Sequence, residues 1–173
     1  PRNRRLFLTA GADGTGKLFS ALEAPRPLLL LEPAAGAAAI ASAASCPAAA
    51  AAAASQGMPA AVTAAAWSPT RPLVFALATA DGVIYLYDLG QSTTVPVSAL
   101  GADGGGGGSG GGDGRGDGSH ERARAPGMLS VAFNPMQRDF LAAGDAYGRV
   151  HVWQLSWGLA NARPGEELAL EQM

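Results

Sequence analysis

The chain has 173 residues, of which 48% are hydrophobic but only 6% aromatic, with 24 Gly and 12 Pro. This length allows one domain or two small ones, and much of the apolar fraction is alanine, which fills little volume in a core. The formal net charge is −2, from 12 Lys and Arg against 14 Asp and Glu. Nucleic acids and anionic membranes attract proteins with a basic surplus, so we expect no nucleic-acid partner.

Two further features bound the class of protein. The leucine run Leu28–Leu31 between two prolines is far too short for a signal-peptide core or a membrane span, so we expect no membrane insertion. A single cysteine, Cys46, cannot form an internal disulfide or a zinc site, and a reducing compartment is the default expectation. The chain begins with Pro1 rather than Met, and we expect that an N-terminal part of the native polypeptide precedes it.

Two stretches have low-complexity composition. Residues 33–57 are rich in alanine and residues 101–127 contain a long glycine tract. Glycine has no side chain to bury and the most backbone entropy to lose, so the second stretch is expected to be a flexible insert. Alanine favours helix, but proline and glycine interrupt the first stretch, which favours a disordered loop over a short helix.

A hairpin pattern occurs three times outside these inserts. Residues 7–20, 75–89 and 140–155 each contain an alternating apolar run, a turn with glycine, and a second alternating run that ends in an aromatic. The turn glycines Gly14, Gly82 and Gly148 are roughly 40 residues apart once the inserts are left out, near the period of WD repeats.

A second element precedes the last two hairpins. Residues 62–72 and 129–139 alternate small and apolar residues up to Trp67 or Phe133 and then turn. Residues 27–31 and 95–100 supply candidate outer strands, because proline is tolerated at a sheet edge. Four strands per unit is the pattern of a propeller blade.

The expected fold class is therefore all-β, a WD40-type β-propeller of which this chain supplies about the last two to three blades. The expected organisation is a partial blade at 1–32, the Ala-rich insert at 33–57, a blade at 58–100, the Gly-rich insert at 101–127, a final partial blade at 128–156 and a polar tail at 157–173.

Several strings resemble one family of WD-repeat proteins. The string WSPTRPLVFA at 67–76, followed by LYDL at 86–89, resembles dynein intermediate chains. The strings LAAGDAYGRVHVWQLS at 141–156 and LFLTAGADGTGKLFSALEAP at 6–25 are similar to the C-terminal repeats of the dynein-2 branch of that family. The resemblance covers nearly all of the chain outside the two inserts.

The resemblance implies a non-catalytic scaffold whose propeller binds the dynein-2 heavy-chain tail, in retrograde intraflagellar transport and cilium assembly. A second intermediate chain and dynein light chains are implied partners, mainly through an N-terminal region outside this sequence, with transport trains contacted indirectly. The implied location is the cilium or flagellum and the ciliary base, associated with the cytoskeleton. One alternative is an intermediate chain of an axonemal or cytoplasmic-1 dynein, and another is a nucleotide-binding protein that uses the loop from Gly11 to Lys17.

The repeats depart from the usual WD pattern. Asp13 and Asp81 fit the usual acidic turn position, but Tyr147 occupies it in the last copy, where Asp145 lies two residues earlier. Met58 and Arg124 stand where WD repeats often have histidine, so these blades are expected to rely on packing. Gly16 lies where a β-branched residue is expected and should weaken its strand. The expected structural repeat positions are Asp13, Gly14, Phe19, Trp67, Asp81, Gly82, Tyr87, Phe133, Gly148 and Trp153.

No catalytic, cofactor-binding or metal-binding residue is expected. The residues Gly11–Lys17 spell the first seven positions of a phosphate-binding loop, but Leu18 replaces the Ser or Thr that would hold magnesium, and a strand pattern follows instead of a helix. His120 lies in the Gly-rich insert, and His151 is most simply the polar face of a strand. The tripeptide Arg115–Asp117 matches an integrin-recognition motif by chance.

Three residues are candidates for partner binding. Trp157 follows the last predicted strand and has no strand partner, so it either contacts another subunit or packs on the propeller rim. Arg71 and Arg138 fall in predicted loops, where each either pairs with an acidic surface on a partner or is a solvated loop charge.

Overall fold

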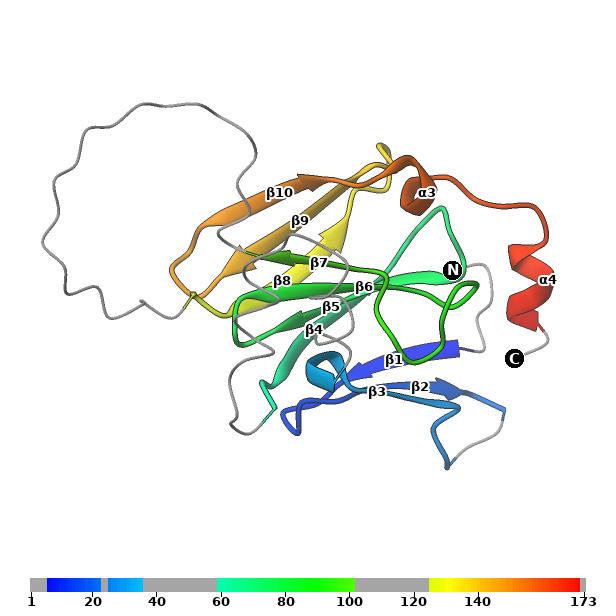
Figure 1. Ribbon diagram of the computed structural model, residues 1–173, viewed down its shortest axis with the longest axis horizontal. Coiled ribbons are helices and arrows are strands. Elements are labelled where there is room, and N and C mark those ends of the chain that lie inside the picture. Colours follow the sequence, from blue (N-terminus) through cyan, green and yellow to red (C-terminus); the bar gives the residue numbers. More distant parts are fainter. Residues whose placement is uncertain (1–5, 23–24, 36–58, 102–124, 172–173) are drawn as a thin grey trace, which may run out of the picture.

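The computed structural model describes residues 6–22, 25–35, 59–101 and 125–171. Most of the predicted Ala-rich and Gly-rich inserts lies outside these residues, as do Cys46, His120 and the two residues expected at the WD histidine position, Met58 and Arg124. The described residues form three antiparallel sheets side by side and two short helices near the C-terminus (Figure 1). Residues 33–35, the described start of the Ala-rich insert, are helical, although the sequence favoured a disordered loop there.

In all three sheets, strands that are neighbours in the chain are neighbours in the sheet. The first sheet contains β1 (Leu6–Ala10), β2 (Gly16–Ser20) and β3 (Leu29–Leu31). The second sheet contains β4 (Val62–Trp67), β5 (Val74–Thr79), β6 (Val83–Asp88) and β7 (Ser98–Gly101).

The third sheet contains β8 (Met128–Phe133), β9 (Phe140–Asp145) and β10 (Val150–Gln154). The helices α3 (Trp157–Ala160) and α4 (Glu166–Glu171) follow it. The expectation of an all-β fold built from propeller blades is confirmed by this architecture. Gly101 pairs with Val83 as the last residue of β7, although the sequence placed it in the Gly-rich insert, and the tail contains two helices that the sequence did not predict.

The three hairpins share one turn geometry. Gly14, Gly82 and Gly148 have φ values of 80°, 86° and 78°, a region that other L-residues rarely adopt. Cross-strand pairs repeat at the same distance from these glycines, namely Phe7 with Phe19, Phe75 with Tyr87, and Leu141 with Trp153. The first two pairs are stacked, with ring centroids 5.2 and 5.1 Å apart.

The second and third sheets meet at their innermost strands. Both β4 and β8 carry a register shift against the next strand, after Val62 and after Met128. The hydroxyl oxygen of Thr63, at the shift in β4, lies 2.5 Å from the carbonyl oxygen of Met128 in β8. The irregularity therefore places a hydrogen-bonding group between two sheets that share no backbone ladder.

The core consists of two layers, one on each face of the second sheet. Alternate residues such as Leu77 and Tyr85 pack toward the first sheet, together with Leu6, Leu18 and Leu31. The intervening residues, Ala76, Ala78, Ile84 and Leu86, pack toward the third sheet, together with Met128, Leu141 and Ala143. Because both faces are covered, every residue of β5 and β6 is buried.

Gly16 marks the closest approach of the first and second sheets. A Cβ added at this residue would lie 2.7 Å from Cδ1 of Leu77, a fully buried side chain in β5. The sequence suggested only that Gly16 weakens its strand. The structure adds a packing reason for the glycine, because a larger residue would force the two sheets apart.

Candidate partner-binding surface

The C-terminal tail crosses from the third sheet to the other two (Figure 1). It follows β10 and forms α3, whose last residue, Ala160, accepts a hydrogen bond of 3.3 Å from the hydroxyl of Thr70 in the β4–β5 loop. It ends at α4, where the buried side chain of Leu170 belongs to the apolar cluster between the first and second sheets. The tail thus contacts parts of all three sheets.

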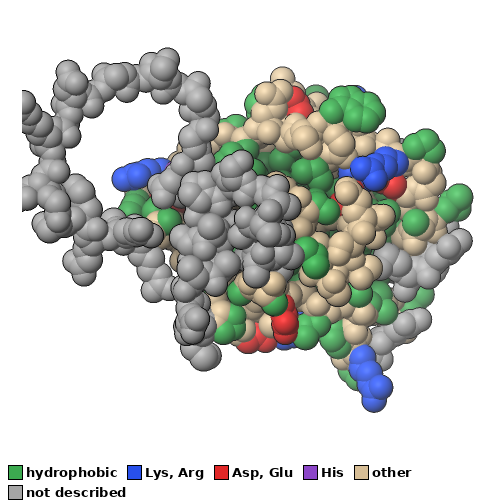
Figure 2. All heavy atoms as spheres, in the orientation of Figure 1, with side chains coloured by type: hydrophobic (Ala, Val, Ile, Leu, Met, Phe, Trp, Pro, Cys, Tyr) green, Lys and Arg blue, Asp and Glu red, His purple; other side chains and the backbone are tan. Residues whose placement is uncertain are grey.

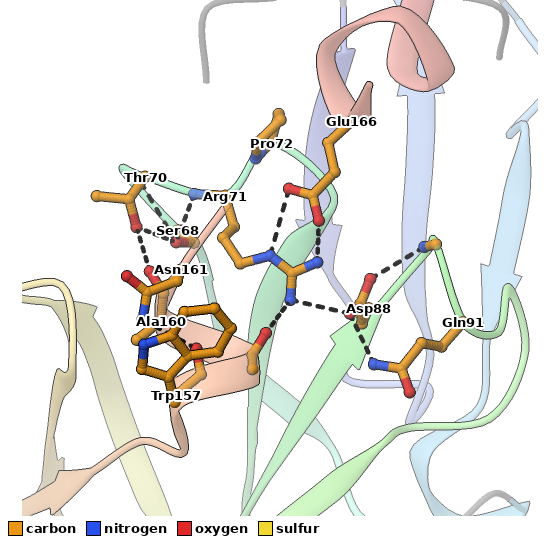
Figure 3. Close-up of polar contacts among 12 residues, drawn as sticks. Ser68, Thr70, Arg71, Pro72, Asp88, Gln91, Trp157, Ala160, Asn161 and Glu166 are labelled. Atoms are coloured by element: carbon orange, nitrogen blue, oxygen red, sulfur yellow. Dashed lines mark hydrogen bonds and ion pairs between the residues drawn. The ribbon is translucent and has the colours of Figure 1, made fainter. Parts of the chain in front are cut away.

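A buried ion cluster lies beneath this tail (Figure 3). The guanidinium of Arg71 donates to Asp88 at 3.0 Å and bonds both carboxylate oxygens of Glu166, one of them through Nε at 3.3 Å. It also donates to the carbonyl oxygen of Gly158 in α3 at 2.5 Å. The side chains of Arg71 and Asp88 are fully buried, and that of Glu166 is 6% exposed. The β4–β5 loop, the end of β6, and both tail helices therefore converge on one side chain.

Burial by itself lowers the pKa of Arg71, but the hydrogen bond to Glu166 and the negative charge of Asp88 outweigh it, and the net shift is upward. The guanidinium therefore stays charged. Asp88 in turn accepts from Gln91 at 2.8 Å and from the backbone of Gly90 at 3.0 Å. Ser68 Oγ accepts the backbone N–H of Arg71 at 3.2 Å, which holds the loop in place.

The prediction that Arg71 is a surface charge available to a partner is wrong. Its side chain has no exposed area, because the tail folds over it and supplies Glu166 as its counter-ion. The sequence separation of 95 residues explains why this pairing could not be read from the chain. Arg71 acts from below, through Gly158, on the helix that carries Trp157.

The other two candidates, Arg138 and Trp157, are brought together on the surface. Trp157 is 78% exposed, and its carbonyl accepts from the side-chain amide of Asn161 at 3.0 Å. The oxygen of that amide accepts from Arg138 at 3.3 Å. Met136, 90% exposed, lies in the same β8–β9 loop as Arg138. We call Met136, Arg138, Trp157 and Asn161 the tail-side surface.

The tail-side surface combines two features of protein-binding sites. Trp157 and Met136 offer large apolar side chains to solvent, and Arg138 adds a planar cation that Asn161 connects to the backbone of Trp157. Trp and Arg are the residue types that most often dominate the energy of protein contacts. The sequence predicted that Trp157 either contacts a subunit or packs on the rim, and its exposure favours the first of these.

The acidic repeat residues have structural partners in their hairpins. Asp13 accepts from the backbone and hydroxyl of Thr15 and from Lys17 Nζ at 2.8 Å. The Lys17 hydrogen bond, helped by Thr15, holds the pKa of Asp13 well below its usual range. Asp81 accepts from the hydroxyl of Thr79. These contacts stabilise turns. The carboxylates of Asp13 and Asp81 are therefore not paired with each other for acid–base chemistry.

The last hairpin uses Asp145 where the sequence pattern put Tyr147. Asp145 Oδ1 accepts the backbone N–H groups of Tyr147 and Arg149, each at 2.9 Å, and Oδ2 lies 3.0 Å from Nε2 of His151. The hydrogen bond to His151 lowers the pKa of Asp145, and the backbone donors add to that effect against burial. His151 also stacks on Trp153 with centroids 5.7 Å apart. The sequence missed this pair because the two residues face each other only across the turn.

The segment Gly11–Lys17 consists of the turn between β1 and β2, at residues 11–15, and the first two residues of β2. The N–H of Gly11 donates to the carbonyl of Thr15 at 2.9 Å, and Gly16 begins a strand. A phosphate loop needs a helix after the glycines so that backbone amides converge on the ligand. Lys17 points to Asp13 instead. The geometry disfavours nucleotide binding at this loop.

The remaining repeat positions support packing. Trp67 donates from Nε1 to the carbonyl of Pro72 at 2.7 Å and packs on Phe75 with centroids 5.4 Å apart. Phe133 and Trp153 pack against the cluster between the second and third sheets. Tyr87 is fully buried, and burial raises the pKa of its hydroxyl. Phe19 stacks on Phe7 at the outer face of the first sheet.

Side chains of like charge do not gather on the face shown in Figure 2, where Lys and Arg lie apart among hydrophobic and uncharged groups. Over the described ranges, no helix is both long and apolar enough to cross a membrane. The same ranges hold no group of three or more His, Cys, Asp or Glu side chains positioned for a metal ion.

Comparison with known proteins places these observations in a family. Residues 55–88 match the family described as WD domain, G-beta repeat. The chain is 32% identical over all of its 173 residues to cytoplasmic dynein 2 intermediate chain 2 of Mus musculus. It is also 32% identical over 166 residues, or 96% of the chain, to the protein of the same name from Homo sapiens. The chain spans about a quarter of the length of these relatives, 24% and 23% respectively.

Proposed function

Because this chain belongs to the WD-repeat intermediate chains of the dynein-2 type, we propose that it is a non-catalytic scaffold whose propeller blades bind the dynein-2 heavy chain. The observation that carries the proposal is the similarity to proteins of that name along the full length of the chain. The architecture supports it, because blades present loops from a rigid frame and suit binding rather than chemistry.

The proposed contact is the tail-side surface. Its apolar side chains are exposed, whereas those of the middle sheet are buried, and its position is set by the buried Arg71 cluster. We propose that Trp157 is the central contact and that Arg138 pairs with a carboxylate of the heavy-chain tail. The proposed role of this protein is in retrograde intraflagellar transport and cilium assembly. Its proposed location is the ciliary base and the cilium or flagellum. A second intermediate chain and light chains are further proposed partners, with transport trains contacted indirectly.

The test is affinity purification of the full-length protein from ciliated cells, followed by mass spectrometry of the proteins recovered. We expect the dynein-2 heavy chain with the wild type and a loss of about tenfold or more with Trp157→Ala, the size expected for a strong interface contact. Tyr147→Ala is the matched control. Tyr147 is an aromatic residue that is 69% exposed, and it lies in the β9–β10 turn of the third sheet, outside the tail-side surface.

Two outcomes would change the proposal. Recovery of an axonemal or cytoplasmic-1 heavy chain would keep the scaffold and reassign its motor, which is the alternative that shares this fold. Equal recovery with Trp157→Ala and with wild type would move the contact away from the tail-side surface.

A further inference from the structure

We infer that residues 157–171 form a strap that docks as one unit across the three sheets. The contacts of Arg71 with both strap helices hold it in place. The strap begins directly after the third sheet, bonds the β4–β5 loop of the second sheet through Ala160, and ends with Leu170 in the cluster between the first and second sheets. It therefore adds a further connection between the sheets, beside the apolar clusters that lie between their faces. This inference does not depend on the identity of the partner.

The strap helices depend on docking for their structure. The helix α3 has four residues and α4 has six, and isolated helices of this length are not stable in water because nucleation is unfavourable. Ser156 makes no side-chain cap bond to α3, and neither helix has a basic residue in its last turn. Their order must come from contacts with the sheets.

One side chain makes the decisive contacts with both helices. Arg71 donates to the carbonyl of Gly158 in α3 and pairs with the carboxylate of Glu166 in α4. Asp88 holds the guanidinium from the other side. Loss of one carboxylate leaves buried charge without a full set of partners, a strongly unfavourable state that opening of the strap would relieve by admitting water. Because the same guanidinium contacts both helices, both should open together.

Leu170 is the second anchor. It is 3% exposed, whereas Leu168 of the same helix is 65% exposed. The apolar contact therefore fixes which face of α4 meets the sheets, and the ion cluster fixes where the helix begins. Opening of the strap would expose Arg71, Asp88 and the site of Leu170, and would also remove the support beneath Trp157.

Hydrogen exchange of the full-length protein tests this inference. The reporters are two backbone amides. That of Asn161 donates to Trp157 in α3, and that of Ala169 in α4 donates to Gly165, the residue before this helix. With Glu166→Gln we expect both amides to exchange about tenfold or more faster, the size expected for loss of a hydrogen bond to a charged group. Asp13→Asn is the matched control, because it removes one carboxylate from an exposed ion pair.

Leu170→Ala gives an independent test if Glu166→Gln prevents folding. We expect faster exchange at Asn161 as well as at Ala169, although Leu170 lies in α4, and no change at either amide with Leu168→Ala. Acceleration at Ala169 alone would show that the helices open separately and would overturn the inference. Unchanged exchange at both amides would overturn it as well. Either result leaves the heavy-chain proposal standing, because that proposal is tested by the proteins that Trp157→Ala recovers.

Discussion

The second and third sheets share a strand pattern but differ in what covers them. Ile84 and Leu86 in β6 occupy the same positions after the turn glycine as Val150 and Val152 in β10. The first two side chains are 0% exposed, whereas Val150 is 73% and Val152 is 61% exposed. The side chains are similar in polarity, so the difference comes from the presence of a neighbouring sheet on that face.

This comparison separates the strand pattern that forms a blade from the packing that stabilises it. The alternation of apolar residues determines which side chains share a face, but burial follows only where a second sheet packs on that face. The middle sheet has neighbours on both faces, and the third sheet has one, among the residues that the structure describes. The energetic weight of equivalent residues should differ accordingly.

The largest loss of stability is expected at the face of the second sheet that the third sheet covers. Leu86→Ala should lower the free energy of unfolding by about 2 to 5 kcal/mol, because it leaves a cavity between two sheets. Val152→Ala, at the equivalent position of β10, should cost about 0.5 kcal/mol or less. Urea unfolding of both variants measures the difference. Equal losses would show that the β10 face is covered in the assembled protein.

The next effect is expected where the first sheet approaches the second. Gly16→Ala should lower stability by about 1 to 3 kcal/mol, because the new Cβ would displace the buried side chain of Leu77. The double variant Gly16→Ala with Leu77→Ala should lose less than the sum of the two single losses, since the smaller side chain makes room. Additive losses in thermal or urea unfolding would mean that the two residues do not compete for space.

A smaller loss of stability is expected from alanine at the turn glycines of the second and third hairpins, Gly82 and Gly148. Gly148 has a φ of 78°, and no atom of the described residues lies within 4 Å of a Cβ added to it, so Gly148→Ala should cost about 1 kcal/mol through backbone strain. Gly82→Ala should cost more, because its Cβ would also lie 2.7 Å from the carbonyl oxygen of Pro126. A comparison of thermal midpoints checks the order, and an equal shift would show that crowding at Gly82 relaxes freely.

The smallest effect is expected at the turn of the third hairpin. The pKa of Asp145 is lowered in the folded protein, so its carboxylate stabilises the fold above the unfolded pKa of about 4 and loses that contribution as the pH falls further. The advantage of wild type over Asp145→Asn should therefore be constant near neutral pH and shrink in acid. Denaturation curves of both proteins between pH 7 and pH 3 test this, and an advantage that grows in acid would contradict it.

The turn glycines, the hairpins and the order of strands could be predicted because they depend on local chemistry. Gly14, Gly82 and Gly148 stand where positive φ is needed, and alternation marks the strands on each side. The acidic residues of the turns followed the repeat, except in the third copy, where Asp145 bonds the backbone from two residues before Tyr147. The sequence shows Asp145 two residues before the usual position, but it does not predict these bonds, because several turn geometries satisfy the same backbone donors.

The candidate surface was predicted only in part. The sequence marks Trp157 as an aromatic without a strand partner and Arg138 as a loop charge, and the structure connects the two through Asn161. Arg71 was placed on the surface by the same reasoning, although it is buried. A loop arginine looks the same in the sequence whether water or a distant carboxylate surrounds it, and only the fold brings Glu166 to it.

By itself the sequence determined the units of this protein, because alternation and turn glycines act over a few residues and repeat along the chain. The tertiary structure alone decided which sheet is covered on both faces, where the tail docks and which arginine the tail covers. Ion pairing and apolar burial join residues far apart in the chain, such as Arg71 with Glu166 and Leu170 with the first two sheets. Such contacts depend on the arrangement of the sheets, which local patterns do not specify.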